Sequence, residues 1–195
     1  LRETSHDGLQ LALNAGGVGL HLPPGVARAA VRNGESDAHG ALMLPRQDAG
    51  MFRGRYPSTM APRTLVKYPD PGLEEPSETV ESFDEDLCQL ADDMVETMRV
   101  EAGIGLAAPQ VGEAVRLTVI DVSGGSDPAA LIVLVNPKVE LEEGESRDEE
   151  GCLSFPEIVL TVKRPARVVI SGQNIEGTPV SFEAEGLLAR CLHHE

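Results

Sequence analysis

Apolar residues recur regularly between Phe83 and Met98, in the longest periodic stretch of the chain. They follow one another at steps of three and four, as on one face of an α-helix, and are Phe83, Leu87, Leu90, Met94, Val95 and Met98. The other face is acidic and comprises Asp84, Glu85, Asp86, Asp92, Asp93 and Glu96. Ser82 with Glu85 three residues later is typical of a capping box, and Gly103 lies where the helix would end. The pattern predicts an amphipathic helix that packs by one face and is solvated on the other.

Beyond Gly112 the pattern changes to short apolar runs separated by Gly, Pro and Asn. These strand-like runs span residues 117–121, 131–135, 159–162, 168–171 and 180–184. Their connections are too short for repeated strand–helix–strand units, which favours antiparallel pairing. A second helical pattern, with Leu187, Leu188, Cys191 and Leu192 apolar, begins near Glu183 and runs to the chain end. The sequence therefore predicts an α+β fold, with mostly antiparallel sheets packed around a C-terminal helix and an amphipathic helix before them.

Residues 140–150 are almost entirely acidic, broken only by Leu141, Gly144, Ser146 and Arg147. We interpret this stretch as a solvated loop or a strand edge. Arg164 follows it, and we interpret this arginine as a structural residue or an ion-pair partner of the acidic stretch, since a single arginine beside many acids is normally paired.

Leu1 to Thr59 differs from the rest of the chain. It has six arginines and no lysine, is rich in Gly and Pro, and lacks sustained periodicity. We therefore predict a disordered leader or upstream non-native sequence at 1–59, with the folded domain at 60–195 beginning at Met60. An organelle transit peptide is the alternative, but five acids and the lack of an amphipathic stripe disfavour it.

The composition limits the possible partners and the compartment. Lys and Arg number 16 against 32 Asp and Glu, a net charge of −16, which argues against direct nucleic-acid binding and against an anionic membrane surface. The three cysteines are few and odd in number, unlike the cysteines of a disulfide framework, and they fit a reducing compartment. No apolar run approaches the roughly 18 residues of a membrane helix. We therefore predict a cytoplasmic protein.

Two stretches carry candidate chemistry in the middle of the chain. Gly103–Gln110 is a run of small residues that ends in an amide. It could be only a turn, yet such backbone lets a substrate approach closely, and the Gln110 amide could donate a hydrogen bond to an oxyanion. Glu150–Ser154 places Cys152 in a glycine-flanked turn after the acidic stretch. A lone cysteine is more often a buried small residue, but this polar setting favours a thiolate that acts as metal ligand or nucleophile.

The third stretch is the dipeptide His194-Glu195. It matches the first half of an H-E-x-x-H helix, in which two histidines one turn apart bind a metal and the glutamate is the base. By itself it is weak, because a histidine at a helix end also complements the helix dipole. His193 points roughly 100° away around the helix, so a third ligand must come from elsewhere. The chain stops three residues before the second histidine of such a motif would fall.

Taken together, the three stretches resemble the motifs of the peptide deformylases, metal hydrolases that remove the formyl group from the N-terminal formylmethionine of new polypeptides. Their order and spacing match, and Lys67–Pro71 before an amphipathic helix is similar to the opening of that family. The resemblance covers Met60 to Glu195, a catalytic domain that we expect to be incomplete at its C-terminus.

The resemblance implies that Cys152 and His194 are metal ligands, which makes the C-terminal helix a metal-binding helix. It implies that Glu195 is the general base, and that the Gln110 side chain and the backbone N–H of Leu153 stabilise the oxyanion. The implied cofactor is one divalent ion. Fe²⁺ is usual in the family, and Zn²⁺, Co²⁺ or Ni²⁺ suit the same ligands.

On the substrate side, the resemblance implies that Ile104, Leu153 and Cys191 line an apolar pocket for methionine. It implies that Gly105 and Gly151 offer backbone hydrogen bonds to an extended peptide. The implied partners are N-formylmethionyl nascent peptides and the ribosome exit region.

Two other functions stay open at this point. With one histidine ligand instead of two, we expect the chain as written to bind metal weakly and to deformylate poorly, so the first alternative is a non-catalytic remnant or peptide-binding module that keeps the fold. The second is an endopeptidase that uses the same helix motif, for which the Cys152 stretch would be a coincidence.

Overall fold

The structure, a computed structural model, describes residues 27–31 and 60–195. Six strands form one sheet in the order β1-β8-β7-β4-β3-β2, and β5 and β6 form a separate two-stranded hairpin. The strands are β1 (Ala27–Val31), β2 (Gly105–Ala107), β3 (Leu117–Ile120), β4 (Ile132–Glu143), β5 (Ser146–Cys152), β6 (Phe155–Arg164), β7 (Arg167–Gln173) and β8 (Pro179–Glu185). The helices are α1 (Glu85–Val100) and α2 (Gly186–His194), with short 3₁₀ turns at Pro71–Glu74, Ala108–Val111 and Pro128–Ala130.

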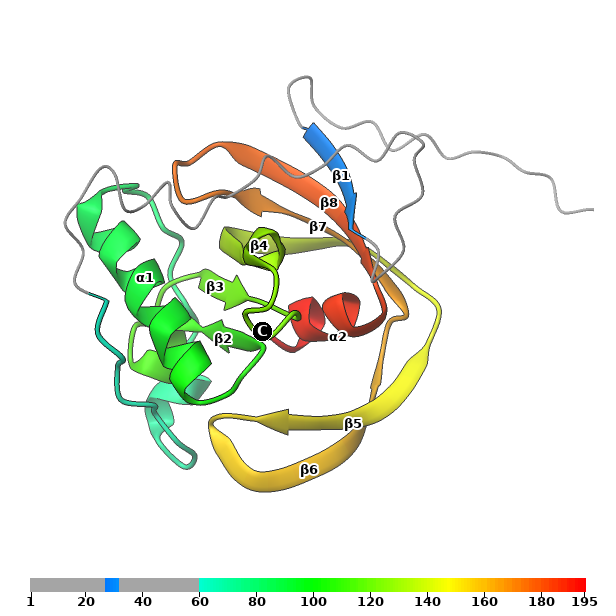
Figure 1. Ribbon diagram of the computed structural model, residues 1–195, viewed down its shortest axis with the longest axis horizontal. Helices are drawn as coiled ribbons and strands as arrows, with labels where there is room; N and C mark the ends of the chain where they lie inside the picture. Colours follow the sequence, from blue (N-terminus) through cyan, green and yellow to red (C-terminus); the bar gives the residue numbers. More distant parts are fainter. Residues whose placement is uncertain (1–26, 32–59) are drawn as a thin grey trace, which may run out of the picture.

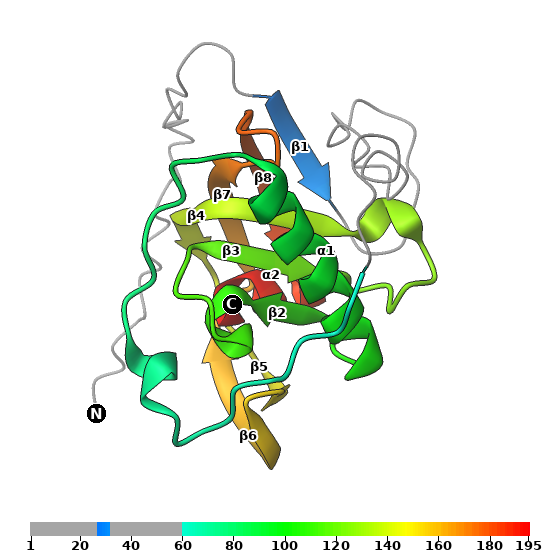
Figure 2. The ribbon, with the colours of Figure 1, turned by 90° about the vertical axis from the view of Figure 1, so that its left-hand side faces the viewer.

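The two helices lie on opposite faces of the large sheet (Figures 1 and 2). Successive side chains of a strand point to opposite faces, and β3 shows this directly. Leu117 and Val119 pack in the cluster under α1, whereas Ile120 packs in the cluster around α2. Apart from the parallel β1–β8 pair, every pairing between these strands is antiparallel. The predicted α+β fold with mostly antiparallel sheets is therefore confirmed.

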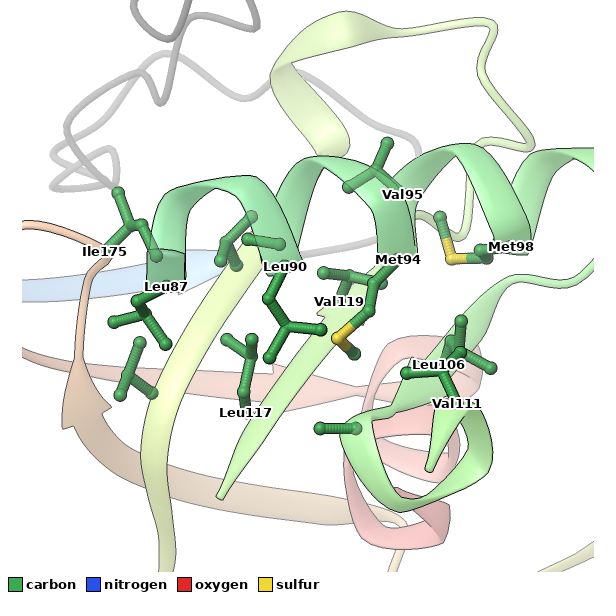
Figure 3. Close-up of a cluster of buried hydrophobic side chains, with 14 of the residues drawn as sticks. Leu87, Leu90, Met94, Val95, Met98, Leu106, Val111, Leu117, Val119 and Ile175 are labelled. Carbon is green, nitrogen blue, oxygen red and sulfur yellow. The ribbon is translucent and has the colours of Figure 1, made fainter. Parts of the chain in front are cut away.

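Helix α1 buries the predicted apolar face against the sheet, and Leu87, Leu90 and Met94 point from the helix toward the strands (Figure 3). Two details of the prediction were wrong. The N-cap is Asp84, whose side chain accepts a hydrogen bond from the backbone of Leu87, and not Ser82.

Asp93, which we assigned to the solvated face, is the second correction, because it is only 7% exposed. Residues from outside the helix cover it. Its carboxylate accepts hydrogen bonds from the backbone of Ala61 and from the side chain of Arg63.

The acidic stretch at 140–150 is β-structure. It forms the end of β4 and most of β5, so the strand-edge interpretation is the correct one of the two. Helix α2 begins at Gly186 and not near Glu183, because Glu183 lies within β8 and is paired with Val169 of β7. Gly186 has a positive φ of 60°, which lets the chain leave the strand and enter the helix.

The leader prediction lies outside the described residues, except for Ala27–Val31. These five residues form β1, which pairs with the outer edge of β8 and which the sequence pattern did not predict. The domain boundary at Met60 stays a prediction.

Candidate active site

The nine side chains and glycines predicted to form the site surround one cavity of about 490 Å³. They are Ile104, Gly105, Gln110, Gly151, Cys152, Leu153, Cys191, His194 and Glu195. Three elements bring them together: the β2 strand with the turn after it, the end of the hairpin strand β5, and the last two turns of α2. Figure 1 shows α2 within the curve of the large sheet, with the β5–β6 hairpin beside it.

Cys152 and His194 are in direct contact at the centre of the site. The hydrogen bond between them changes both pKa values more than any other interaction does. It lowers the pKa of the Cys152 thiol and raises the pKa of His194 to about 9. The Gln110 side chain also reaches this point, because its Nε2 lies 3.6 Å from the Cys152 Sγ. The Cys152 sulfur, an imidazole and an amide donor therefore meet at one place.

The Glu195 carboxylate lies against β2 at Gly105. A Cβ atom on Gly105 would come within 2.6 Å of both the Glu195 Oε1 and the Cys191 Sγ, so only glycine leaves room for them. Burial raises the pKa of Glu195 to about 7. Burial likewise raises the pKa of the Cys191 thiol, which keeps this cysteine in its neutral, apolar form.

Glu150 connects the hairpin to α2 and to the site. Its carboxylate accepts hydrogen bonds from Arg164 at 2.8 Å, from Arg190 at 2.6 Å and from the Nδ1 of His194 at 2.9 Å. Together with burial, which opposes them, these bonds set the pKa of Glu150 to about 2, and the bond from Arg164 contributes most. Arg164 is therefore an ion-pair partner of the acidic stretch, at its last acidic residue.

Arg190 was missed by the sequence analysis, although it is only 6% exposed. Its Nη2 also binds the Ser146 hydroxyl and its Nη1 the Val162 carbonyl, so it ties both strands of the hairpin to α2. One signal could have revealed it. An arginine in the middle of an otherwise apolar helix is almost never buried without a charged partner, and the acidic stretch offers one.

The two adjacent histidines of α2 are held by different hydrogen-bond partners. Glu150 is ionised and can only accept, so the Nδ1 of His194 donates to it, and the other ring nitrogen is left for the contact with Cys152. Arg164 can only donate, so the Nδ1 of His193, 3.0 Å from the Arg164 Nη1, is the acceptor. The Nε2 of His193 then donates to Glu142 at 3.1 Å, away from the cavity.

The donor set fits a divalent transition metal. Thiolate and neutral imidazole are its preferred ligands, and a carboxylate on the far nitrogen of the imidazole is the usual supporting partner at such sites. Cys152, His194 and Glu150 provide this combination. Within the part of the chain that the structure describes, no group of three or more His, Cys, Asp or Glu side chains forms a full ligand set.

A family model described as polypeptide deformylase matches residues 62–195. The chain belongs to the peptide deformylase family. A peptide deformylase of Acidobacterium capsulatum is 48% identical over 133 residues, which are 68% of this chain and 78% of the relative. One of Thermodesulfovibrio yellowstonii is 47% identical over 136 residues, which are 70% of this chain and 82% of the relative.

Solved deformylase structures agree with this fold. The structure of the Legionella pneumophila enzyme matches with a TM-score of 0.66 and 43% identity over 69% of this chain and 78% of that chain. The Thermotoga maritima peptide deformylase matches with a TM-score of 0.65 and 38% identity over 69% of this chain and 88% of that chain. The predicted function is thereby confirmed: this peptide deformylase is a metal-dependent hydrolase that removes the N-formyl group from the formylmethionine of new polypeptides. Among the described residues, no helix combines the length and apolar character needed to cross a bilayer.

Proposed function

We propose that Cys152 and His194 hold the divalent ion of this deformylase and that Glu195 and Gln110 act on the substrate. The arrangement around the cavity supports these roles. The Cys152 thiol and the His194 imidazole are in contact, and the Gln110 amide lies 3.6 Å from the thiol. A divalent cation at this point would supply the Lewis acidity that polarises the formyl carbonyl and makes a water molecule acidic.

The reaction is a hydrolysis in which water attacks the formyl carbon. Glu195 accepts the proton of the attacking water and delivers it to the amine, as the bond between the formyl carbon and the nitrogen breaks. Formate and a free N-terminal amine leave. During the attack, the Gln110 Nε2 and the backbone N–H of Leu153 donate hydrogen bonds to the oxygen that becomes negative. Such a donor typically contributes ~10²–10³ in rate.

The methionine side chain enters the apolar part of the cavity. Ile104, Leu153 and Cys191 line this part, and the neutral, buried Cys191 thiol adds an apolar surface. Gly105 and Gly151 lie at the same cavity and leave their backbone groups open to an extended peptide. We therefore assign the nine residues to three roles: metal ligands, catalytic groups and substrate contacts.

The identity of the ion and the place of action are finer points of the same proposal. Fe²⁺ is our first choice because it is usual in this family, and Zn²⁺, Co²⁺ and Ni²⁺ suit a thiolate with imidazole equally well. We place the enzyme in the cytoplasm, near the ribosome exit, because its substrate is the start of a nascent chain. Metal analysis of the protein purified without oxygen distinguishes Fe²⁺ from the other ions.

The ligand assignment is tested with Cys152→Ala and Cys88→Ala in the full-length enzyme. Cys88 is a free cysteine on α1 that does not line the cavity, so its variant is the matched control. We expect Cys152→Ala to lose the thiolate-to-Co²⁺ absorption band and formate release together, whereas Cys88→Ala keeps both. A Cys152→Ala enzyme that retained the band would refute the assignment.

A further inference from the structure

The N-terminal strap, residues 60–68, is fastened to helix α1 at one end. The backbone N–H of Arg63 donates to the Thr97 hydroxyl at 2.8 Å. The Arg63 side chain binds Asp93 at 3.2 Å and Glu113 at 2.6 Å. Because Asp93 and Thr97 are both buried, these contacts hold the strap at a fixed place on the core.

The other end of the strap joins two of the catalytic turns. The Val66 N–H donates to the backbone carbonyl of Gln110 at 2.8 Å, and the Val66 carbonyl accepts from the Ser154 hydroxyl at 2.8 Å. The Tyr68 N–H donates to the Ser154 carbonyl at 3.0 Å. Val66 and Tyr68 of the strap therefore hold the turn that carries Gln110 and the turn that follows Cys152 at a fixed spacing.

Ser154 passes this constraint on to the Gln110 amide. The Gln110 Oε1 accepts from the backbone N–H of Ala107 at 2.8 Å, which fixes which end of the amide is oxygen. The Ser154 hydroxyl has given its hydrogen to Val66, so its oxygen can accept from the Gln110 Nε2 at 3.4 Å. One Nε2 hydrogen is thus engaged, and the second is directed to the side of the Cys152 Sγ, 3.6 Å away.

Ser154 is only 2% exposed and does not line the cavity, so it cannot act on the substrate directly. We propose that Ser154 is a positioning residue for catalysis: anchored by the strap, its hydroxyl aims the Gln110 amide at the reacting formyl oxygen. This inference rests on the proposed role of Gln110 as oxyanion donor. A hydrogen-bond donor that is free to rotate accelerates the reaction less, because it is not already oriented toward the oxyanion when the reaction begins.

The test is a double-mutant cycle of Ser154→Ala and Gln110→Ala in the full-length metal-loaded enzyme. We expect Ser154→Ala to lower kcat for a formylmethionyl peptide by about 10-fold, a smaller loss than the ~10²–10³ expected for Gln110→Ala. KM and metal content stay unchanged. In the Gln110→Ala background, the second change has no further effect on kcat, since there is no amide left to aim. Ser154→Thr, which keeps the hydroxyl, recovers most of the lost rate.

Ser181→Ala is the matched control, because Ser181 is equally buried but lies on β8 and does not line the cavity. We expect it to leave kcat unchanged. The inference fails if Ser154→Ala lowers kcat as much in the Gln110→Ala background as alone. It also fails if Ser154→Ala changes only the unfolding free energy and not kcat. In both cases the Ser154 hydroxyl is structural, and the proposed role of Gln110 stands. If Gln110→Ala itself leaves kcat unchanged, the proposed role of Gln110 fails and the inference with it.

Discussion

Helix α1 is held on the sheet by apolar packing, whereas the β5–β6 hairpin is held beside α2 by charges. Under α1, Leu87, Leu90 and Met94 are all at most 8% exposed. On β6, by contrast, Val159 and Leu160 are 60% and 61% exposed, and the hairpin is fastened through Glu150 to Arg164 and Arg190. The hydrophobic effect has no preferred direction, whereas the hydrogen bonds of an ion network have preferred distances and angles. The charged region is also the one that carries the Cys152 turn and holds His194.

The largest effect is expected from Glu150→Ala, which breaks the charged region. Glu150 is 8% exposed and Arg190 is 7% exposed at the side chain, and removing one partner of a buried ion pair typically costs ~3–5 kcal/mol in unfolding free energy. His194 also loses its supporting carboxylate, which lowers metal affinity by about 10–100-fold.

Denaturant unfolding and Co²⁺ titration measure these two effects of Glu150→Ala. The control is Glu149→Ala on the same strand, an exposed neighbour that we expect to change neither. An equal loss in both variants would mean that the charge of the hairpin matters and not the ion network.

Met94→Ala is the counterpart in the apolar region. Met94 is fully buried, and truncating it leaves a cavity that lowers the unfolding free energy by ~2–5 kcal/mol. Because no residue of the site lies on α1, we expect kcat and metal affinity at low temperature to stay as they are. Met94→Leu, which nearly conserves volume, serves as control with a cost below ~1.5 kcal/mol. A kcat that fell in proportion to stability would show that the two regions are not separable.

Ala102→Gly is the smallest change and acts at the border of the two regions. Ala102 follows α1 with a positive φ of 55°, a conformation that is unfavourable for residues with a Cβ atom. We expect glycine to raise the unfolding free energy by ~0.5–1 kcal/mol. Glycine relieves the backbone strain at this position, and the greater entropy of glycine in the unfolded chain offsets part of that gain. Ala91→Gly, inside the helix, should instead lower the unfolding free energy. An increase in unfolding free energy at both positions would argue against strain at Ala102.

The apolar region could be predicted from the sequence almost completely. The spacing of Leu87, Leu90 and Met94 is a local signal, and helix periodicity reports which face is buried. The charged region could not be predicted in this way, because its partners are far apart in sequence. Glu150 and Arg190 are separated by 40 residues, and the sequence around either residue does not predict its partner.

One of the two wrong assignments in α1 has the same cause, and the other is local. The helical pattern predicts that Asp93 lies on the solvated face of α1. The strap residue Arg63, 30 residues away, instead forms an ion pair with Asp93. The cap was assigned to Ser82 by a motif, whereas the competing acceptor Asp84 begins the helix. The candidate site was found because its residues belong to motifs, and the residues that support it, Ser154 and Arg190, were not assigned any role.

The most direct measurement is formate release by Glu195→Gln in the full-length enzyme, together with its metal content and its unfolding midpoint. Glu195 is assigned to the chemistry and not to the fold or the ion. We therefore predict a fall in kcat of ~10²–10⁴, the usual contribution of a general base, with full metal content and an unfolding midpoint that is unchanged or higher. An enzyme that kept its kcat, or that lost its metal and its fold together with the activity, would contradict this account.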